Sequence, residues 1–481
     1  MSHNVPTYIG FEEYSEHVPA SIPAAVQQAT TRFVRGRAAR VAELPQWEEL
    51  RQMGSDIRLH TIENMDVYLT RLEEEVIAAG GHVHWAETAE EANRIVLQIA
   101  KEHNVRTVVK SKSMATEEIG LNHALQQAGI QAIETDLGEY IIQLAGTGPS
   151  HIIVPAVHLK KEEVAALFSE KLDMHAPTDP IELARIAREI LREKFLSAEM
   201  GISGGNFLIA ETGTLVLVTN EGNGRMCTTM PDLHVAVVGI DKVIPDWESL
   251  TVFLQLLARS ATGQKLSTYT QFITGPPREE GEFGPKEFHL VLLDNGRSRV
   301  LKDPIGREVF KCIRCGACAN VCPVYQNVGG FAYGSFISGP IGAILTPQML
   351  GTQAARELPY ASTLCGACAD VCPVKIPIPT ILRHLRRRVA EGDEFAEATV
   401  PVPIRVTAGL ASFALAQNWL YRFSTQLLPT LMSVFKRDGW IRSAPYPLSR
   451  WTKVRPLPAF TASFRSWWKN VHAANRKDST R

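Results

Sequence analysis

The chain has 481 residues, of which 45% are hydrophobic and 21% are charged, and its formal net charge at pH 7 is −1. This length and composition allow two or three domains with cores of their own and exclude a disordered or collagen-like protein. The N-terminus lacks a basic segment followed by an apolar run, and no stretch of about 18 apolar residues occurs, so we expect neither a signal peptide nor a membrane span.

The first 300 residues predict a helical segment and then alternating strands and helices. Residues 1–64 are predicted to be helical, because apolar residues from Pro45 to Ala79 recur at helical spacing. Strands are predicted at 82–86, 107–109, 130–134, 151–155 and 288–293, β-rich runs at 206–220 and 234–243, and helices at 89–103, 117–128, 160–172, 180–196 and 246–260. Thr88 and Asp246 are the expected N-caps of two of these helices. The alternation favours an α/β domain at 65–300 with a mostly parallel sheet.

The composition changes twice after residue 300. Residues 301–390 hold seven of the eight cysteines, and residues 391–481 form a basic, tryptophan-rich tail. The last 81 residues contain 13 Lys or Arg, two Asp and five of the eight tryptophans, with a short apolar stretch from Val406 to Ala416. We expect the tail to dock to a partner protein or a membrane surface. The alternative is that the tail folds back over the α/β domain.

The first cysteine run has the spacing of bacterial ferredoxins. It reads Cys312, Cys315, Cys318 and Cys322, followed by Pro323, which is C-x2-C-x2-C-x3-C-P. Three thiolates at this spacing wrap one iron–sulfur cube, and the fourth cysteine, which the proline turns away, ligates the other cluster. The run therefore predicts a dicluster module in a reducing cytoplasm rather than a disulfide framework.

The second cysteine run repeats the first with one change. Cys365, Cys368 and Cys372 share the pattern Cys-Gly-Ala-Cys-Ala-x-Val-Cys-Pro-Val with the first run, but Ser362 stands where a leading cysteine is expected. Crossed ligation assigns Cys312, Cys315, Cys318 and Cys372 to cluster one, and Cys322, Cys365 and Cys368 to cluster two.

Two [4Fe-4S] clusters are therefore predicted, and the second has only three cysteine ligands. Its fourth iron is either absent, which makes a [3Fe-4S] centre, or bound to water, to Ser362 or to a group from a partner or substrate. A zinc site built from Cys-x-x-Cys pairs is the alternative, which the doubled run and its Cys-Pro endings disfavour.

Several nucleotide and metal motifs are missing from the sequence. There is no G-x-G-x-x-G after a strand, no Walker A loop and no H-E-x-x-H. The chain thus shows no site for a flavin or a nicotinamide, and oxidation of an organic substrate would need another subunit.

Five further stretches, together with the cysteine runs, resemble the lactate utilization protein B family over nearly the whole chain. They are Lys110 to Met114 with Thr116 to Glu118, Glu134 to Glu139, Ala210 to Thr214, Leu293 to Ser298, and Gly339 to Ala343. In that family the second run also has three cysteines, so Ser362 agrees with the family pattern.

The resemblance implies a fold, a role and partners. The α/β domain is expected to be similar to the sugar-phosphate isomerase and coenzyme A transferase fold, and an α-helical two-cluster ferredoxin-type module follows it. The implied role is electron transfer in the oxidation of L-lactate to pyruvate, which permits growth on lactate. The implied partners are a cysteine-rich subunit and a second α/β-domain subunit, in the cytoplasm or at a membrane surface.

Four other features each have a functional interpretation and a purely structural one. Lys110 and Lys112 end a strand, where α/β sheets bind ligands, and either hold a carboxylate such as lactate or are solvated, with a pairing to Glu117. Glu211 lies in an apolar run and is either an acid/base group or the end of a strand. Arg383, Arg386, Arg387 and Arg388 either neutralise cluster charge or contact an acidic partner, or they form a solvated basic face. Cys227 is interpreted as a free structural cysteine, unless the domains bring it to the open iron.

Two other classes of function compete with the electron carrier. One is a self-sufficient enzyme whose three-cysteine cluster binds substrate as a Lewis acid, so whether the chain is itself an enzyme stays open. The other is an iron–sulfur sensor that binds nucleic acid through the basic tail. The doubled run favours electron transfer, and no nucleic-acid motif is present, so no nucleic-acid partner is expected.

Overall fold

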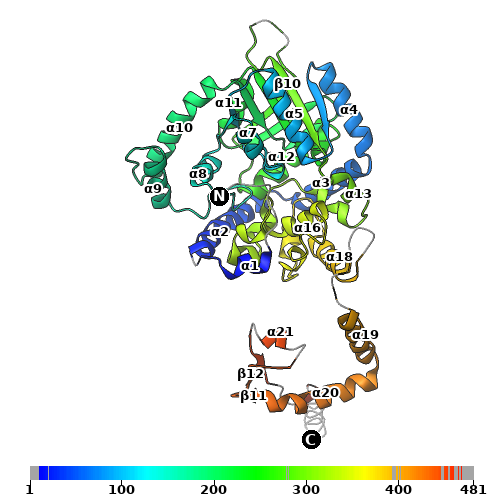
Figure 1. The fold of residues 1–481 in the computed structure, drawn as a ribbon. Helices are drawn as coiled ribbons and strands as arrows, with labels where there is room; N and C mark the ends of the chain where they lie inside the picture. Colours follow the sequence, from blue (N-terminus) through cyan, green and yellow to red (C-terminus); the bar gives the residue numbers. More distant parts are fainter. Residues whose placement is uncertain are drawn as a thin grey trace. The chain divides into compact units, whose positions relative to one another are not determined.

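The computed structural model describes residues 10–19, 21–277, 279, 281–392, 397–398, 400, 402–445, 449–452, 455–459, 464 and 467–468. The chain divides into two compact units, residues 1–399 and 400–481, and each is described by itself (Figure 1).

A six-stranded parallel sheet forms the centre of the first unit. Its strand order is β1-β10-β7-β4-β2-β3, and every neighbouring pair is parallel. The strands are β1 (His82–Ala86), β2 (Thr107–Lys110), β3 (Gln131–Glu134), β4 (Met200–Ser203), β7 (Leu233–Gly239) and β10 (Glu287–Leu293). The carboxyl ends of all six therefore lie at one edge, and the predicted α/β domain with a mostly parallel sheet is confirmed.

Both faces of this sheet are buried, because successive side chains of a strand point to opposite faces. Along β10, Leu290 and Leu292 belong to one core, whereas Val291 and Leu293 belong to another. The second core contains α5 (Ala89–Glu102) and α7 (Leu121–Gln127), and the first contains α4 (Met65–Ala78). A third core lies around α8 (Leu137–Ala145), α9 (Lys161–Lys171) and α10 (Pro180–Ser197).

The predicted N-caps of two helices are confirmed. Thr88 Oγ1 accepts a hydrogen bond from the Glu91 N–H at 3.2 Å at the start of α5. Asp246 Oδ1 accepts one from the Ser249 N–H at 2.8 Å at the start of α12 (Trp247–Ala261). These bonds satisfy backbone donors that the first turn of a helix leaves free.

A smaller mixed sheet packs beside the first, in the order β8-β5-β6-β9. It contains β5 (Phe207–Ile209), β6 (Thr214–Thr219), β8 (Val243–Ile244) and β9 (Tyr269–Ile273), and α11 (Asn223–Thr229) follows β6. The predicted run 206–220 is thus two antiparallel strands joined by a turn at Gly213, which has φ +63°. An added Cβ there would lie 2.5 Å from the Val76 nitrogen, so the turn and its close approach to α4 require glycine.

Two predicted elements are wrong. Residues 151–155 form turns rather than a strand, because His151 Nδ1 accepts hydrogen bonds from the N–H groups of Ile153 and Val154 at 3.0 and 3.2 Å. The predicted helix 117–128 is two helices, α6 (Met114–Glu118) and α7, separated by Gly120 with φ +64°. In both places a local hydrogen bond or a left-handed residue overrides the apolar pattern.

Helices surround the part of the first unit that carries both cysteine runs. This part contains α13 (Arg297–Leu301), α14 (Ala317–Asn320), α15 (Pro323–Val328), α16 (Gly339–Leu350), α17 (Ala367–Asp370) and α18 (Ile378–Glu391). The N-terminal helices are α1 (Phe11–Glu16), α2 (Ser21–Ala42) and α3 (Trp47–Glu63), of which α2 packs against α14 and α15. The N-terminal segment is therefore part of the wall around the cysteines.

The second unit contains helices and a small antiparallel sheet. Its elements are α19 (Val402–Ala416), α20 (Asn418–Met432), β11 (Lys436–Arg437), β12 (Trp440–Ile441), α21 (Ser449–Thr452) and β13 (Leu457–Pro458). Leu410, Phe413 and Trp419 are exposed on the two longer helices. None of the helices in the described part of the chain is long and apolar enough to cross a membrane. Much of the predicted basic tail beyond residue 459 lies outside the described residues.

Candidate iron–sulfur site and adjoining cavity

The structure brings the seven cysteines of the two runs into two groups. Burial and then the charges of Cys312, Cys315 and Cys372 raise the pKa of Cys318. Burial and then the charges of Cys322 and Cys365 raise the pKa of Cys368 to about 12. The charge of Cys368 also acts on Cys318, so the two groups lie close together, and the assignment of cysteines to the two clusters stays a prediction.

The two cysteine loops have matching backbones. Arg314 and Leu364 each precede a cysteine and each have positive φ, +59° and +56°. Gly316 and Gly366 follow those cysteines with φ +73° and +91° and begin α14 and α17. Left-handed non-glycine residues are strained, and such strain persists where the surrounding structure holds it at a functional site.

The chemistry of the donor set fits iron–sulfur clusters. Cys315, Cys322, Cys368 and Cys372 are buried, and burial is the first cause of the raised pKa of each thiol. Buried thiolates at close range repel one another unless cations lie between them. Soft sulfur donors of this number suit iron–sulfur clusters, which would supply those cations.

The second group contains an exposed cysteine and a serine that is already hydrogen-bonded. Cys365 is exposed, whereas Cys322 and Cys368 are buried. Ser362 Oγ accepts a hydrogen bond from the Leu364 N–H at 3.1 Å, so this hydroxyl holds the loop before Cys365. Tyr333 is fully buried, its hydroxyl has no hydrogen-bond partner among the described residues, and burial and then the charge of Cys322 raise its pKa. The sequence analysis did not single out Tyr333, because eleven residues separate it from Cys322.

Arginines from the N-terminal helices hold the second cysteine run. Arg51 donates hydrogen bonds to the carbonyl oxygens of Cys372 and Asp370, both at 2.9 Å. Arg37 donates to the Val371 carbonyl oxygen at 2.9 Å, and burial lowers the pKa of its guanidinium. The helical pattern of residues 1–64 carries no signal for these contacts, which join residues more than 300 positions apart.

A cavity of about 390 Å3 adjoins the first cysteine run. It lies at the carboxyl ends of the parallel strands, where Gly204 follows β4 and Gly239 ends β7. Ile313 and Arg314, which separate Cys312 from Cys315, line another part of it. The α/β domain and the cysteine runs therefore share this cavity.

The structure separates the two lysines predicted to act together. Lys110 is fully buried and pairs with Glu134 at 2.7 Å and Glu117 at 3.0 Å, so it is structural rather than solvated. Lys112 lines the cavity and donates a hydrogen bond to the Ile153 carbonyl oxygen at 2.8 Å. Burial is the main cause that lowers the pKa of Lys112.

Two other predicted features have structural roles. Glu211 lies in the turn after β5, where Oε2 accepts a hydrogen bond from the Trp247 N–H at 3.3 Å. Cys227 is fully buried beside Thr135 Oγ1 at 3.3 Å, and burial raises the pKa of its thiol to about 12, which fits a structural cysteine.

Two arginines of the basic run on α18 make structural contacts. Arg386 donates hydrogen bonds to the carbonyl oxygens of Pro359 and Ser362, both at 2.8 Å, and thereby holds the segment before the second cysteine run. Arg388 pairs with Asp303 at 2.9 Å.

Gly201 to Gly205 match the G-x-S-x-G pattern of serine hydrolases, a match that the sequence-based predictions missed. Ser203 is fully buried, and its Oγ lies 2.8 Å from His234 Nε2. His234 Nδ1 has no hydrogen-bond partner among the residues that the structure describes. This pair therefore has neither the exposed nucleophile nor the oriented histidine of a hydrolase.

Comparison with family models agrees with this architecture. Residues 69–293 match the LUD domain, and residues 308–376 match the 4Fe-4S dicluster domain. The fold and the cysteine groups thus define an iron–sulfur protein in which a 4Fe-4S dicluster domain follows a LUD domain.

Curated relatives match over almost the full length. Lactate utilization protein B of Macrococcus caseolyticus (strain JCSC5402) is 46% identical over 472 residues, which cover 96% of this chain and 98% of the relative. The protein of the same name from Bacillus thuringiensis (strain Al Hakam) is 45% identical over 447 residues, which cover 93% of each chain. This chain belongs to the lactate utilization protein B family.

A solved structure is similar at a much lower level. The crystal structure of a DUF162 family protein from Deinococcus radiodurans is 15% identical and covers 48% of this chain and 98% of that chain. Its TM-score is 0.28, so it supports no argument about this fold.

Proposed function

We propose that this chain is the electron-carrying subunit of a complex that oxidises L-lactate to pyruvate. The names of the curated relatives support the substrate, and the dicluster domain supports the role. One observation carries the proposal: α14, which contains Cys318, packs against α17, which contains Cys368, so the two groups lie side by side. When bound, the two clusters supply one-electron steps and accept the two electrons of lactate one at a time.

The residues of the chain hold and insulate this pair of sites. Arg51 and Arg37 fix the loop that carries Cys372, and Ser362 and Arg386 fix the loop that carries Cys365. Buried apolar side chains of Ile313, Val374 and Ile376 exclude water from the first group. The exposed Cys365 makes the second group the natural point of exchange with a partner.

The proposed ligand sets follow the crossed pattern. Cluster one is held by Cys312, Cys315, Cys318 and Cys372, and cluster two by Cys322, Cys365 and Cys368. The proposed partners are a cysteine-rich subunit and a second α/β-domain subunit of the same system. A partner is needed because lactate releases two electrons together, and the sequence shows no flavin or nicotinamide motif that could accept them.

A growth experiment tests this function. Deletion of the gene is expected to abolish growth on L-lactate and to leave growth on pyruvate normal, in a strain without a second lactate dehydrogenase. In the purified complex, L-lactate should reduce the clusters of this chain, whereas the chain alone should stay oxidised. Reduction of the chain alone by L-lactate would favour a self-sufficient enzyme and contradict the proposal.

A further inference from the structure

The cavity beside the first cysteine run has the place and size of a ligand site. Open parallel sheets bind their ligands at the carboxyl ends of the strands, and this cavity lies there. Its volume of about 390 Å3 is that of a small-molecule site. An occupant would contact Ile313 and Arg314 and so lie against the loop that joins Cys312 to Cys315.

Positive charge exceeds negative charge on one side of the cavity. Asp241 Oδ1 accepts a hydrogen bond from Arg297 Nε at 2.6 Å. The other oxygen of Asp241 lies 3.1 Å from Lys242 Nζ and 3.6 Å from Arg314 Nη2. Glu118 binds Arg297 through two contacts of 2.8 Å. With Arg58 and the Cys312 thiolate, whose charges also act on Lys242, four cationic groups meet three anionic groups, which leaves room for one more anion.

Lys242 and Arg314 both keep donor capacity that the described residues do not use. Arg314 Nη1 makes no hydrogen bond with any residue that the structure describes, and Lys242 Nζ, which carries three donor hydrogens, has the ion pair with Asp241 at 3.1 Å. Their side chains are only 13% and 11% exposed, and an unsatisfied charged donor at such depth is costly. Asp136 and Glu221 also line the cavity, and their charges act on Lys112.

Resting on the function proposed above, we propose that this cavity binds a small organic carboxylate of the 2-hydroxy or 2-oxo acid class. Its carboxylate accepts hydrogen bonds from Lys242 and Arg314, because its two oxygens match the unused N–H of Arg314 Nη1 and a further N–H of Lys242 Nζ. Leu217, Leu257 and Phe336 line the cavity and contact the carbon skeleton. The ligand thereby lies beside the first cysteine group.

Calorimetric titration of the full chain, reconstituted with iron and sulfide under anaerobic conditions, tests this site with pyruvate as the probe. The wild type is expected to bind one pyruvate. Lys242→Met and Arg314→Gln should each weaken binding about ten-fold or more, because each removes a charged donor. Lys286→Met is the matched control and should bind normally, because Lys286 is exposed and pairs with Asp232 away from the cavity.

A further variant tests the effect of cavity volume separately from the effect of the cationic side chains. Ala258→Leu fills part of the cavity without removing a cation and should also weaken pyruvate binding. Iron content and electron paramagnetic resonance verify that every variant keeps its clusters. The proposal is wrong if the wild type binds no pyruvate, or if Lys242→Met and Arg314→Gln shift only the reduction potential of cluster one. Failure of the proposed function looks different, because pyruvate would bind while L-lactate failed to reduce the assembled complex.

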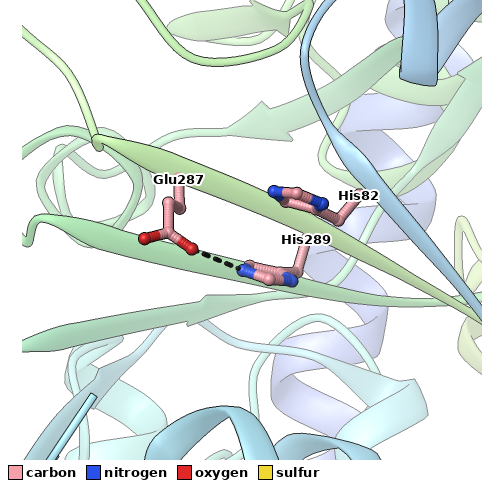
Figure 2. A group of neighbouring side chains, drawn as sticks. All are labelled: His82, Glu287 and His289. Carbon is pink, nitrogen blue, oxygen red and sulfur yellow. Dashed lines mark hydrogen bonds and ion pairs between the residues drawn. The ribbon is translucent and has the colours of Figure 1, made fainter. Parts of the chain in front are cut away.

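A different observation carries an independent proposal at the opposite edge of the parallel sheet. Figure 2 shows His82 at the start of β1 beside Glu287 and His289 at the start of β10. The register of the two strands pairs His82 with His289. One ligand atom from each of the three side chains lies within 4.8 Å of the others. Rigid neighbouring strands therefore hold three metal-ligating groups together.

The distances around Glu287 match those of a tetrahedral metal. Glu287 Oε2 lies 3.3 Å from His289 Nε2 and 3.4 Å from His103 Nε2. A tetrahedral zinc ion with bonds of about 2.0–2.1 Å holds its ligand atoms about 3.3–3.4 Å apart. Glu287 Oε2 and His289 Nε2 are thus one tetrahedral edge apart, whereas His103 lies outside the group of three close ligands.

A neighbouring histidine orients the buried ligand. His84 Nε2 lies 3.0 Å from His289 Nδ1, so that ring nitrogen is already bonded. The other nitrogen, Nε2, points at Glu287 (Figure 2). Metal-ligating histidines characteristically use their second nitrogen in a bond of this kind, which fixes the tautomer and the direction of the ring.

We infer that His82, Glu287 and His289 bind a divalent transition metal of the Zn2+ class. The ligands are imidazole and carboxylate, which zinc accepts and which differ from the thiolates of the cluster sites. His82 is exposed, so the ion can enter from solvent.

Zinc added to the reconstituted full chain tests this site. After gel filtration, elemental analysis should find one zinc per chain beyond the iron, and zinc X-ray absorption should show nitrogen and oxygen ligands at about 2.0–2.1 Å. His289→Ala and Glu287→Gln should lose this zinc, whereas His175→Gln, at an exposed histidine, should keep it. Retention of no zinc, sulfur ligands at about 2.3 Å, or equal zinc in His289→Ala would each overturn the inference.

Discussion

The guanidinium of Arg51, on the N-terminal helix α3, donates a hydrogen bond from Nε to the carbonyl oxygen of Cys372 at 2.9 Å. The same side chain also donates to the carbonyl oxygen of Asp370 at 2.9 Å and pairs with Glu48 at 2.7 Å. It thereby occupies carbonyl groups at the end of α17 that the helix itself cannot satisfy. The helix before the α/β domain is thus part of the support of cluster one.

Replacing Arg51 should therefore weaken cluster one selectively. Arg51→Gln removes charge-assisted hydrogen bonds to the Cys372 loop, which contribute about 2–3 kcal/mol, and leaves the second group untouched. We expect faster loss of iron from cluster one under a chelator, followed by electron paramagnetic resonance. Arg185→Gln is the control, because Arg185 is exposed and pairs only with Glu182 and Glu189. Equal loss from both clusters would contradict a local role for Arg51.

Cysteine substitutions should separate the two clusters. Cys312→Ser removes a ligand from the first group and should damage cluster one while cluster two stays partly formed, and Cys365→Ser should do the reverse. Iron analysis of the wild type should give about eight irons per chain, or about seven if cluster two lacks its fourth iron. A count near two, or zinc in place of iron, would rule out the dicluster assignment.

The buried hydroxyl of Tyr333 lies near Cys322 and has no hydrogen-bond partner among the described residues, so we expect it to donate to a sulfur of bound cluster two and to raise the reduction potential of that cluster. A hydrogen bond to a cysteine sulfur stabilises the more negative, reduced cluster. A bond of about 1 kcal/mol corresponds to a few tens of mV for one electron, so Tyr333→Phe should lower the potential by that amount. Tyr14→Phe, at an exposed tyrosine, should leave it unchanged. A redox titration in which Tyr333→Phe matches the wild type would show that the hydroxyl does not act on the cluster.

Local sequence patterns predict the parts of this molecule that depend on local geometry. The alternation of β10, with Leu290 and Val291 on opposite faces, follows from the period of a strand. The spacing of Cys312, Cys315 and Cys318 reports a loop around one cluster, so it too is a short-range signal. The sheet and the two cysteine groups were therefore predictable.

Long-range contacts leave no such pattern. Arg51 and Cys372 are 321 residues apart, and nothing near Arg51 marks it as different from a solvated helix arginine. The cavity could not be predicted from local sequence either, because it forms only where the strand ends and Arg314 come together in the fold. Residues 151–155 were predicted as a strand because the segment is rich in apolar residues. Instead, the ring of His151 accepts the hydrogen bonds of backbone N–H groups that would pair with a neighbouring strand.

Acid should destabilise the first unit through His234. Burial lowers the pKa of this histidine to about 3, from 6.5. Below pH 6.5 the unfolded chain therefore binds a proton that the folded chain does not, and stability falls as the pH drops toward 3. The free energy of unfolding should decrease by about 1.4 kcal/mol per pH unit from this residue alone.

His234→Gln removes this proton linkage and keeps a polar group for Ser203. Urea unfolding of the wild type and the variant between pH 7.5 and about 5.5 checks the difference in slope. Other buried histidines, such as His151 with a pKa of about 4, titrate equally in both proteins and cancel in the comparison. Identical slopes would show that His234 does not stay neutral in the folded chain.

The C-terminal unit should serve assembly rather than the folding of the cluster-bearing unit. Residues 400–481 form a compact unit of their own, and Leu410, Phe413 and Trp419 are exposed on its helices. Exposed aromatic and aliphatic side chains within a strongly basic segment suit an acidic protein face or an anionic lipid surface. A chain that ends at residue 399 is therefore expected to keep its clusters and its thermal stability but to lose assembly with its partners. Pull-down of the partner subunits and sedimentation with vesicles that contain anionic lipid distinguish the two surfaces. If the shortened chain assembles and supports growth on L-lactate normally, the unit has another role, and a loss of clusters would mean instead that it folds back over the first unit.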